Sequence, residues 1–460
     1  MKKALLFVIA LFASVMIMPT TYALDGVASV DGVNYENLQE AIDNANGKTV
    51  TLLSDVTESV TILEGTTVTL DLGSYTLTNV EGQNTITNNG NLTIKGSGTV
   101  DNVSHAKAAV FNDKTGEVIL ESGTYTRSQE TGASAEESGG NSFYTIQNYG
   151  NMTIESGVQV LNKGSFSSLL ENGFYDGSSM NPGGLVTPTL TINGGLFDGG
   201  LNTIKNDDYG VLIINGGTFT NVAQAAVLNW NNTTINGGTF TSDKYAVLNG
   251  KLDNVMDTGT LMIKGGTFTA GNGYDVIAKM NGSSVDFVNV SVSGGVFNKS
   301  IDGSLLDIDD SKDLLQDANG NYVIANKEAN YDKVKELITE ANRLDKSKYT
   351  DESVRVLEDA LSRVDFSKNG LEQADVDKMA TDIENAIKGL VEKTEEPIVP
   401  EDPDIDEPSQ DLPEFPNVNL PDKDVKDEVS NPKTADSISY AYIALLISGL
   451  GVGIALKKLA

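Results

Sequence analysis

An eight-residue unit with a central glycine pair and an aromatic end returns through the middle of this chain. It reads Leu-Thr-Ile-Asn-Gly-Gly-Leu-Phe at residues 190–197 and recurs at residues 212–219, 233–240, 261–268 and 290–297. Apolar and polar residues alternate along each unit, which is the period of a strand. The glycines permit the positive φ of a tight corner. Short strands that bend at fixed corners bury their apolar face only against neighbouring repeats, so the unit predicts stacked rungs.

A second mark, a short apolar stretch followed by asparagine, precedes most copies. Each rung is therefore predicted to contain a short strand, an asparagine turn, a strand, a glycine corner and another short strand. Weaker copies of the unit lie at residues 92–100, 118–125 and 152–160, and the longer steps suggest inserted loops or an unmarked extra turn. The asparagine amides are expected to hydrogen bond from rung to rung. The predicted ladder consists of Asn88, Asn112, Asn148, Asn206, Asn229 and Asn249.

The spacing also predicts two apolar stacks inside the solenoid. One consists of Ile192, Ile214, Ile235, Ile263 and Val292, and the other of Phe197, Phe219, Phe240, Phe268 and Phe297. The alternative is that the aromatic rings or the asparagines face outward as a platform for glycans. Because nearly every rung carries them, and a binding site would be local, the interior placement is favoured.

Residues 35–45 have the apolar spacing of an amphipathic helix, which would cover the exposed strand edge at the start of the solenoid. Strands are predicted at residues 50–53, 60–62, 68–72 and 75–78. With this cap, residues 24–325 resemble the pectate-lyase-like β-helix proteins of bacterial surfaces. The resemblance implies a mainly β fold, a right-handed parallel β-helix, and carries little information on function.

After the solenoid the apolar period changes to that of a helix. Residues 328–393 contain three amphipathic segments and predict a three-helix bundle. The segment 344–350, with residues 353–361 and 386–390, is similar to the FIVAR module of Gram-positive surface proteins. The resemblance implies either a matrix- or sugar-binding role or a rigid stalk. Residues 394–430 follow, rich in proline and acidic residues, and predict an extended, disordered spacer.

Both ends of the chain carry export signals. Residues 1–23 read as a secretory signal peptide, with two lysines, an apolar run and a small residue at the end. Residues 431–460 resemble a sortase sorting signal: a pentapeptide, an apolar stretch at 438–456 long enough to cross a membrane, and a basic tail. The pentapeptide consists of Asn431, Pro432, Lys433, Thr434 and Ala435. The resemblance implies cleavage after Thr434 by a sortase, joining of Thr434 to a peptidoglycan precursor, and an extracellular, wall-anchored protein of a Gram-positive-type bacterium.

Composition excludes several classes of function. The formal net charge is −32, and such a chain repels nucleic acid and anionic lipid. There is no cysteine, so disulfides and thiolate chemistry are excluded, and the single histidine, His105, rules out a multi-histidine metal site. No cofactor is expected. A cluster at Asp307, Asp309, Asp310 and Asp313 leaves weak calcium binding open, against a solvated end loop.

Candidate catalytic residues are few. Asp207 and Asp208 faintly resemble the paired aspartates of polygalacturonases, but the other motifs of that family are missing. They are expected to be solvated turn residues, with a catalytic role as the alternative. Arg127, the only arginine in the predicted solenoid, falls in a predicted loop, and His105 is expected at the surface.

The leading hypothesis is an adhesin or structural rod that binds a glycan or host matrix and is not an enzyme. The alternative is a wall-attached polysaccharide lyase or glycoside hydrolase, and the inserts 127–143 and 161–189 are where either site is expected.

Overall fold

A computed structural model describes residues 26–134, 137, 142–175, 186–250, 259–280 and 289–394. The predicted signal peptide 1–23, the spacer from residue 395 onward, the pentapeptide with Thr434 and the apolar stretch 438–456 lie outside the described residues. Where the chain is described it is mainly β, with parallel sheets and few helices, consistent with a β-solenoid. Residues 26–326 are called the solenoid below.

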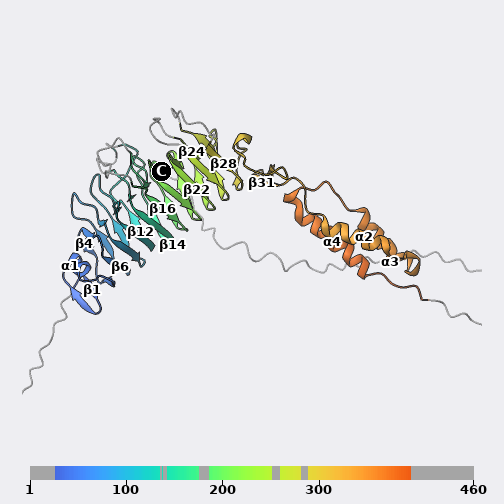
Figure 1. The fold of residues 1–460 in the computed structure, drawn as a ribbon, viewed down its shortest axis with the longest axis horizontal. Coiled ribbons are helices and arrows are strands. Elements are labelled where there is room, and N and C mark those ends of the chain that lie inside the picture. Colours follow the sequence, from blue (N-terminus) through green and yellow to red (C-terminus); the bar gives the residue numbers. More distant parts are fainter. Residues whose placement is uncertain are drawn as a thin grey trace, which may run out of the picture. The chain divides into compact units, whose positions relative to one another are not determined.

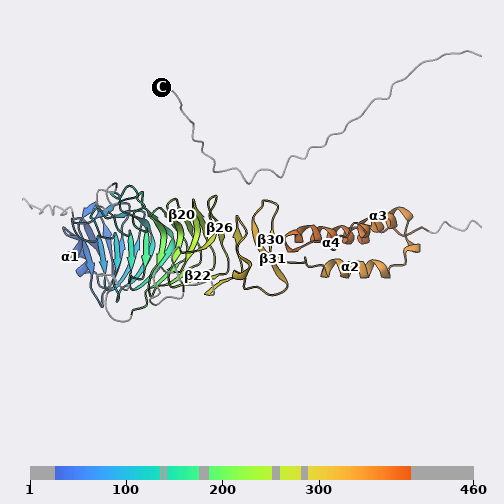
Figure 2. The same ribbon diagram turned by 90° about the horizontal axis from the view of Figure 1, so that it is seen from above.

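Two parallel sheets run along the solenoid, and successive segments of the chain contribute strands to one sheet and then to the other (Figures 1 and 2). Sheet B consists of β5 (Val60–Ile62), β8 (Ile86–Asn88), β11 (Val110–Asn112), β13 (Ile146–Asn148), β15 (Leu170–Asn172), β18 (Asn202–Asn206), β21 (Ala225–Asn229), β24 (Tyr245–Asn249) and β27 (Ile277–Lys279). Each of these strands pairs in parallel with the next, so one strand of sheet B marks one rung.

Sheet A holds the remaining strands, usually two from each rung. Strands before the glycine corner are β3 (Lys48–Leu52), β6 (Thr67–Asp71), β9 (Asn91–Lys95), β16 (Thr189–Ile192), β19 (Val211–Ile214), β22 (Asn232–Ile235), β25 (Thr260–Ile263) and β28 (Val290–Val292). Strands after it are β4 (Val56–Thr57), β7 (Thr76–Thr78), β10 (Thr99–Asp101), β17 (Leu196–Asp198), β20 (Thr218–Asn221), β23 (Thr239–Ser242), β26 (Thr267–Thr269) and β29 (Val296–Phe297). The long strands β12 (Glu117–Thr126) and β14 (Asn151–Leu161) run through the corner without a break.

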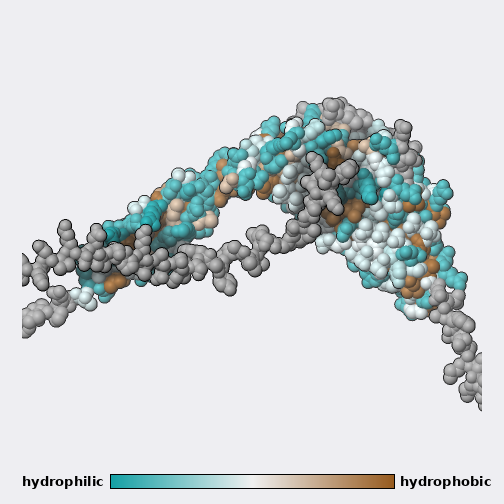
Figure 3. Space-filling view, turned by 180° about the vertical axis from the view of Figure 1, so that it is seen from behind, coloured by the Kyte–Doolittle hydropathy of each residue, from teal (hydrophilic) through white to brown (hydrophobic). Residues whose placement is uncertain are grey.

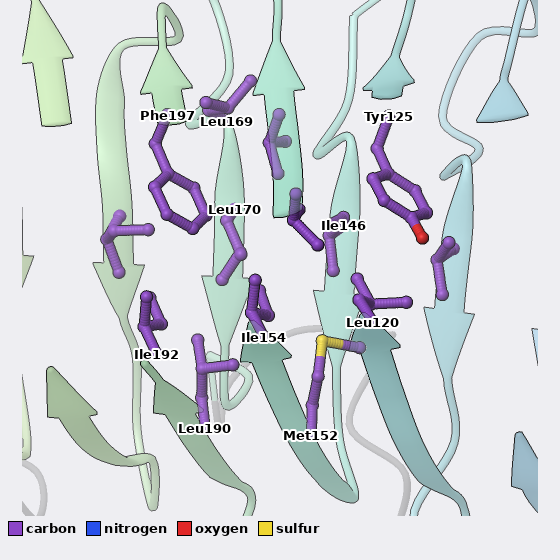
Figure 4. Close-up of a cluster of buried hydrophobic side chains, with 14 of the residues drawn as sticks. Leu120, Tyr125, Ile146, Met152, Ile154, Leu169, Leu170, Leu190, Ile192 and Phe197 are labelled. Atoms are coloured by element: carbon purple, nitrogen blue, oxygen red, sulfur yellow. The ribbon is translucent and has the colours of Figure 1, made fainter. Parts of the chain in front are cut away.

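The predicted interior stacks are confirmed. The five residues of the Ile/Val stack are in register from β16 to β28 and are fully buried. The five phenylalanines are also fully buried, and consecutive ring centroids are 4.8, 4.7, 4.8 and 5.3 Å apart. The outward glycan platform is therefore wrong for these rings. Figure 4 shows the neighbouring part of the same core, where Leu120, Ile154 and Ile192 point toward the strands of sheet B.

The asparagine ladder is confirmed and has one more member than predicted. Each amide Nδ2 donates to the Oδ1 of the next rung, at 2.8 to 3.0 Å, from Asn88 to Asn249. Asn172 on β15 fills the gap between Asn148 and Asn206. The ladder is buried, so from Asn112 to Asn249 each Oδ1 accepts from the amide of the preceding rung where no water reaches.

The second glycine of each corner lies close to the phenylalanine ring two residues later in the chain. The second glycine of each pair has a positive φ, 112° at Gly217 and 110° at Gly238. A Cβ added at Gly238 would lie 3.2 Å from the ring of Phe240 and from the carbonyl oxygen of Gly217. Backbone conformation and ring packing therefore both require glycine at this position.

The long steps of the repeat are inserted loops and not an extra turn. Strand β14 pairs directly with β12 on one side and with β16 on the other, so no rung lies between them. The additional residues fall in the sequence between β12 and β13, between β14 and β15 and between β15 and β16, and the strands that follow are in register with those of the preceding rung. The rungs therefore keep a continuous core although the chain between them varies in length.

Antiparallel strands close both ends of the solenoid. At the start, β1 (Ala28–Val30) pairs with β2 (Val33–Tyr35) and β3, and the predicted helix is present as α1 (Leu38–Asp43), which buries Leu38, Ala41 and Ile42. At the other end, β31 (Tyr322–Asn326) pairs with β29 and with β30 (Lys312–Gln316). These pairings use edge hydrogen bonds that would otherwise invite another chain.

Three helices follow the solenoid: α2 (Asp332–Arg343), α3 (Asp351–Ser362) and α4 (Gln373–Lys388). They share a core in which Leu337, Leu357 and Ile383 are buried. No helix in the described part of the chain is both long and apolar enough to cross a membrane.

Candidate functional site

Asp207 and Asp208 follow β18 and are fully buried, so the expectation that they are solvated turn residues is wrong. The two side chains do not act as a pair in a cleft. Asp207 Oδ1 accepts from the backbone N–H of Asp208 at 2.8 Å, and its Oδ2 contacts the ammonium of Lys205. Asp207 therefore belongs to a cluster on the outer face of sheet B.

The cluster joins two neighbouring rungs. Glu171 on β15 and Lys205 on β18 are paired in register, and Lys205 Nζ lies 3.6 Å from Glu171 Oε1. The side chains of Glu171, Lys205 and Asp207 are 3, 13 and 0 % exposed. We call these three residues the ionic cluster. Its single ammonium lies between two carboxyl groups in a site from which water is largely excluded.

Polar groups from the next rung surround Glu171. The amide Nε2 of Gln147 donates to Glu171 Oε2 at 2.7 Å and contacts the hydroxyl of Tyr149 at 3.0 Å. Tyr144 and Asp207 also interact electrostatically with Glu171. Burial first, and then Asp207, raise the pKa of Glu171 to about 8, although Lys205 opposes this. Glu171 is therefore mainly a neutral acid at neutral pH.

Aromatic rings extend along the same outer face. Phe111, Tyr149, Phe174 and Tyr209 form a continuous row with ring centroids 5.2 to 5.5 Å apart. Lys205 Nζ lies 4.4 Å from the centre of the Trp230 ring, in a cation–π contact. Burial raises the pKa of Tyr149, which keeps its hydroxyl neutral. The ionic cluster therefore lies in an aromatic surrounding of low polarity.

The geometry of the ionic cluster does not suit glycoside hydrolysis. That reaction needs two carboxyl groups about 5 Å or more apart, with a sugar between them. Here Glu171 and Asp207 both contact the same ammonium, that of Lys205, so no sugar can lie between them. The arrangement favours proton exchange between three neighbouring groups over attack on a bound glycan.

Arg127 lies directly after β12 and is fully buried, together with Glu130. Its Nε donates to Glu130 Oε2 at 2.9 Å, and its NH2 group donates to the carbonyl oxygen of Ser104 at 2.9 Å. Glu130 in turn accepts from the backbone N–H of Phe143 at 3.0 Å. This pair holds the first residues and the return of the 127–145 insert against the solenoid, so its role is structural.

The other candidate residues do not assemble into a site. His105 is exposed, and its Nδ1 accepts from the backbone N–H of Ser142 at 3.3 Å. Asp307 accepts from the hydroxyl of Ser291, and Asp309 caps the turn at Ser311, whose hydroxyl and N–H lower the pKa of Asp309. Within the described ranges, no group of three acidic or histidine side chains is placed to hold a metal ion. Weak calcium binding stays a prediction.

A shallow groove crosses the outer face of sheet A. It encloses about 300 Å³ and spans β6, β9, β12, β14 and β16. Leu92, Val118 and Met152 also border it, but their side chains are buried in the solenoid core, and its only charged lining residue is Glu117. The other lining residues come from equivalent strand positions of successive rungs: Thr67, Asn91, Thr93, Ile119, Asn151, Thr153, Thr189 and Thr191. We call this the sheet A groove. Figure 3 shows that the visible solenoid surface is largely of intermediate to hydrophilic character.

A second groove lies between α3 and α4. It is lined by Ser353, Val356, Ala360, Asn385, Ala386, Gly389 and two ion pairs. In those pairs Arg363 contacts Asp359 at 2.6 Å, and Lys378 contacts Asp382 at 2.8 Å. The groove combines apolar and polar side chains with two exposed ion pairs, and it does not decide between a stalk and a binding module.

The sequence interpretation missed Glu171, Lys205 and Gln147. All three occupy the middle position of the apolar-x-asparagine mark, whose side chain faces outward on sheet B. The mark at residues 169–172, Leu-Leu-Glu-Asn, was not among the predicted members of the ladder, although it has the same pattern as the others. A comparison of the middle positions rung by rung would have revealed an acid next to a base.

No family model matches this chain, and neither a curated protein nor a solved structure is similar to it.

Proposed function

We propose that this chain is an exported adhesin, joined to the cell wall through Thr434, whose solenoid binds an extended, uncharged glycan along the sheet A groove. In this proposal the solenoid is a right-handed parallel β-helix and residues 328–393 are a FIVAR-like stalk. The observation that carries the binding role is the groove itself. Its threonine and asparagine side chains repeat with the spacing of the rungs, about 4.8 Å, which suits a polymer that offers hydroxyl groups at regular intervals.

Other features support binding over catalysis. The groove has one carboxylate, Glu117, and no basic lining residue to act with it, so it lacks the paired groups of a hydrolase or a lyase. The half-exposed Ile119 offers contact area for the flat face of a sugar ring. Negative charge over the whole chain disfavours anionic polysaccharides, so the proposed ligand is neutral.

Blocking the groove is expected to abolish binding. Thr153 lies in the groove, and a Thr153→Arg variant places a long side chain across it, which should weaken binding of a neutral polysaccharide by about tenfold or more. Thr234→Arg is the matched control, because Thr234 is at the same strand position on β22 but does not line the groove. Retention of the full chain on a panel of immobilised plant, host and bacterial polysaccharides measures both. Equal loss in the two variants, or new reducing or unsaturated chain ends with the unmodified protein, would contradict the proposal.

The anchoring role is tested separately. Replacement of Thr434 by alanine removes the residue whose carbonyl would be joined to the wall, so the variant is expected in the membrane fraction and the medium. Purified walls boiled in detergent should retain the unmodified protein and release the variant. Ser430→Ala, just outside the pentapeptide, is the control and should stay wall-linked. A Thr434→Ala protein that resists detergent would show that the sorting interpretation is wrong.

A further inference from the structure

The ionic cluster has a composition that ordinary packing does not require. Other positions of the same outward column are filled with apolar side chains, such as Leu228, Leu248 and Ala278, all of them buried. Burying an ammonium and two carboxyl groups costs free energy that apolar residues of similar size would not cost. The three side chains therefore call for a chemical explanation.

We propose that Lys205 and Glu171 condense to an intramolecular amide, with Asp207 as the base, and so crosslink the rungs of β15 and β18. Each role follows from a contact. Lys205 Nζ is the nucleophile and lies 3.6 Å from Glu171 Oε1. Asp207 Oδ2 touches the same ammonium and is placed to accept its proton. Glu171 supplies the carbonyl carbon.

Protonation favours these roles. Attack by an amine requires a carboxylic acid and not a carboxylate, and the raised pKa of Glu171, about 8, provides the acid at neutral pH. Burial lowers the pKa of Lys205, but the two neighbouring carboxyl groups outweigh this and the net shift is upward. Lys205 is therefore charged at rest, and transfer of its proton to Asp207 must precede attack.

The step balances in atoms and charge. The neutral amine adds to the Glu171 carbonyl, and the oxygen that becomes negative can be stabilised by Gln147 Nε2, now 2.7 Å from Glu171 Oε2. Asp207 gives a proton to the departing hydroxyl, which leaves as water, and then takes the second proton of the nitrogen. The products are one amide, one water molecule and a neutral Asp207. The cluster is thus neutral before and after, as a buried site requires.

The surrounding structure favours such a bond. The cluster is almost closed to solvent, which disfavours hydrolysis of the amide. The bond would join the neighbouring rungs of β15 and β18, which the 173–188 insert separates in the sequence. Because the chain has no cysteine, a disulfide cannot make this connection. By closing the chain between residues 171 and 205, the amide would restrict the unfolded ensemble as other crosslinks do.

Mass spectrometry of the full chain tests the proposal without any variant. The intact mass is expected to be lower than the sequence mass by one water molecule, and a protease digest should contain one branched peptide in which Lys205 is joined to Glu171. Lys205→Arg keeps the positive charge but cannot form the amide, so the mass deficit should disappear. Lys95→Arg is the matched control, because Lys95 forms an exposed ion pair with Asp71, 3.7 Å apart, and the deficit should remain.

Three results would overturn the inference. One is a full sequence mass in protein that has been folded and stored at neutral pH. Another is a deficit that maps to an aspartyl or asparaginyl imide elsewhere in the chain. The third is a branched peptide that joins Lys205 to Asp207, since this would reverse the roles of the two acids. Asp207→Asn in an otherwise folded protein should slow formation of the bond at least about tenfold, and an unchanged rate would remove Asp207 from the mechanism.

Discussion

Replacing Phe240 with alanine is expected to lower the free energy of unfolding by about 3–5 kcal/mol, the usual cost of removing a buried aromatic ring. Phe240 is fully buried between Phe219 and Phe268, with ring centroids 4.7 and 4.8 Å away and ring planes tilted by 4° and 6°. Backbone hydrogen bonds hold the rungs at a fixed spacing, so the neighbouring rings cannot close the cavity. Chemical denaturation followed by circular dichroism measures the loss.

Thr241→Ala is the control for this prediction. Thr241 is the next residue on β23, faces outward and is exposed, so its replacement should change the free energy of unfolding by less than about 0.5 kcal/mol. Because each rung contacts only its neighbours, the effect of Phe240→Ala should be centred on the rungs of β20, β23 and β26 and be visible there by hydrogen exchange. If both variants unfold at the same denaturant concentration, the ring stack contributes little to stability.

Arg127→Met is the second variant for which we expect a large loss, about 3–5 kcal/mol, because it leaves the carboxylate of Glu130 buried without its ion partner. The carbonyl oxygens of Ser104 and Lys107 lose a donor in the same variant. The loss is expected in the free energy of unfolding and in hydrogen-exchange protection of residues 101–107 and 128–134.

A double variant separates charge from packing. Arg127→Met with Glu130→Gln removes both charges, so it should be more stable than Arg127→Met alone. Lys95→Ala breaks an ion pair whose side chains are 40 and 29 % exposed, and it should cost less than about 1 kcal/mol. A double variant no more stable than Arg127→Met would mean that the lost contacts, and not the unpaired carboxylate, determine the cost.

Local chemistry made much of the solenoid predictable. The phenylalanine stack and the Ile/Val stack each keep the same spacing from the glycine pair, and the asparagine ladder follows a short apolar stretch in each rung, so a single rung predicts its neighbours. The starting helix was also predictable, since Leu38, Ala41 and Ile42 lie on one face. The hairpin of β1 and β2 was not predicted, because three-residue strands carry too little pattern to be recognised alone.

The site was harder to predict for a different reason. Asp207 is a candidate in the sequence because Asp208 follows it directly. In the fold its partners are Lys205 and, from another rung, Glu171. Burial of these residues was not predictable either, since a charged side chain on the outward face of a strand is normally solvated.

The sequence by itself therefore determined the rung: which residues face inward, where the chain turns, and why glycine, asparagine and phenylalanine occupy their places. These properties depend on contacts within one repeat or between identical positions of successive repeats. Only the tertiary structure decided which rungs are neighbours across the inserts, and thus that Glu171 meets Lys205. The physical reason is that the hydrogen bonds of the sheets set the register of the rungs, while loops of almost any length can leave the stack and return at small cost in free energy.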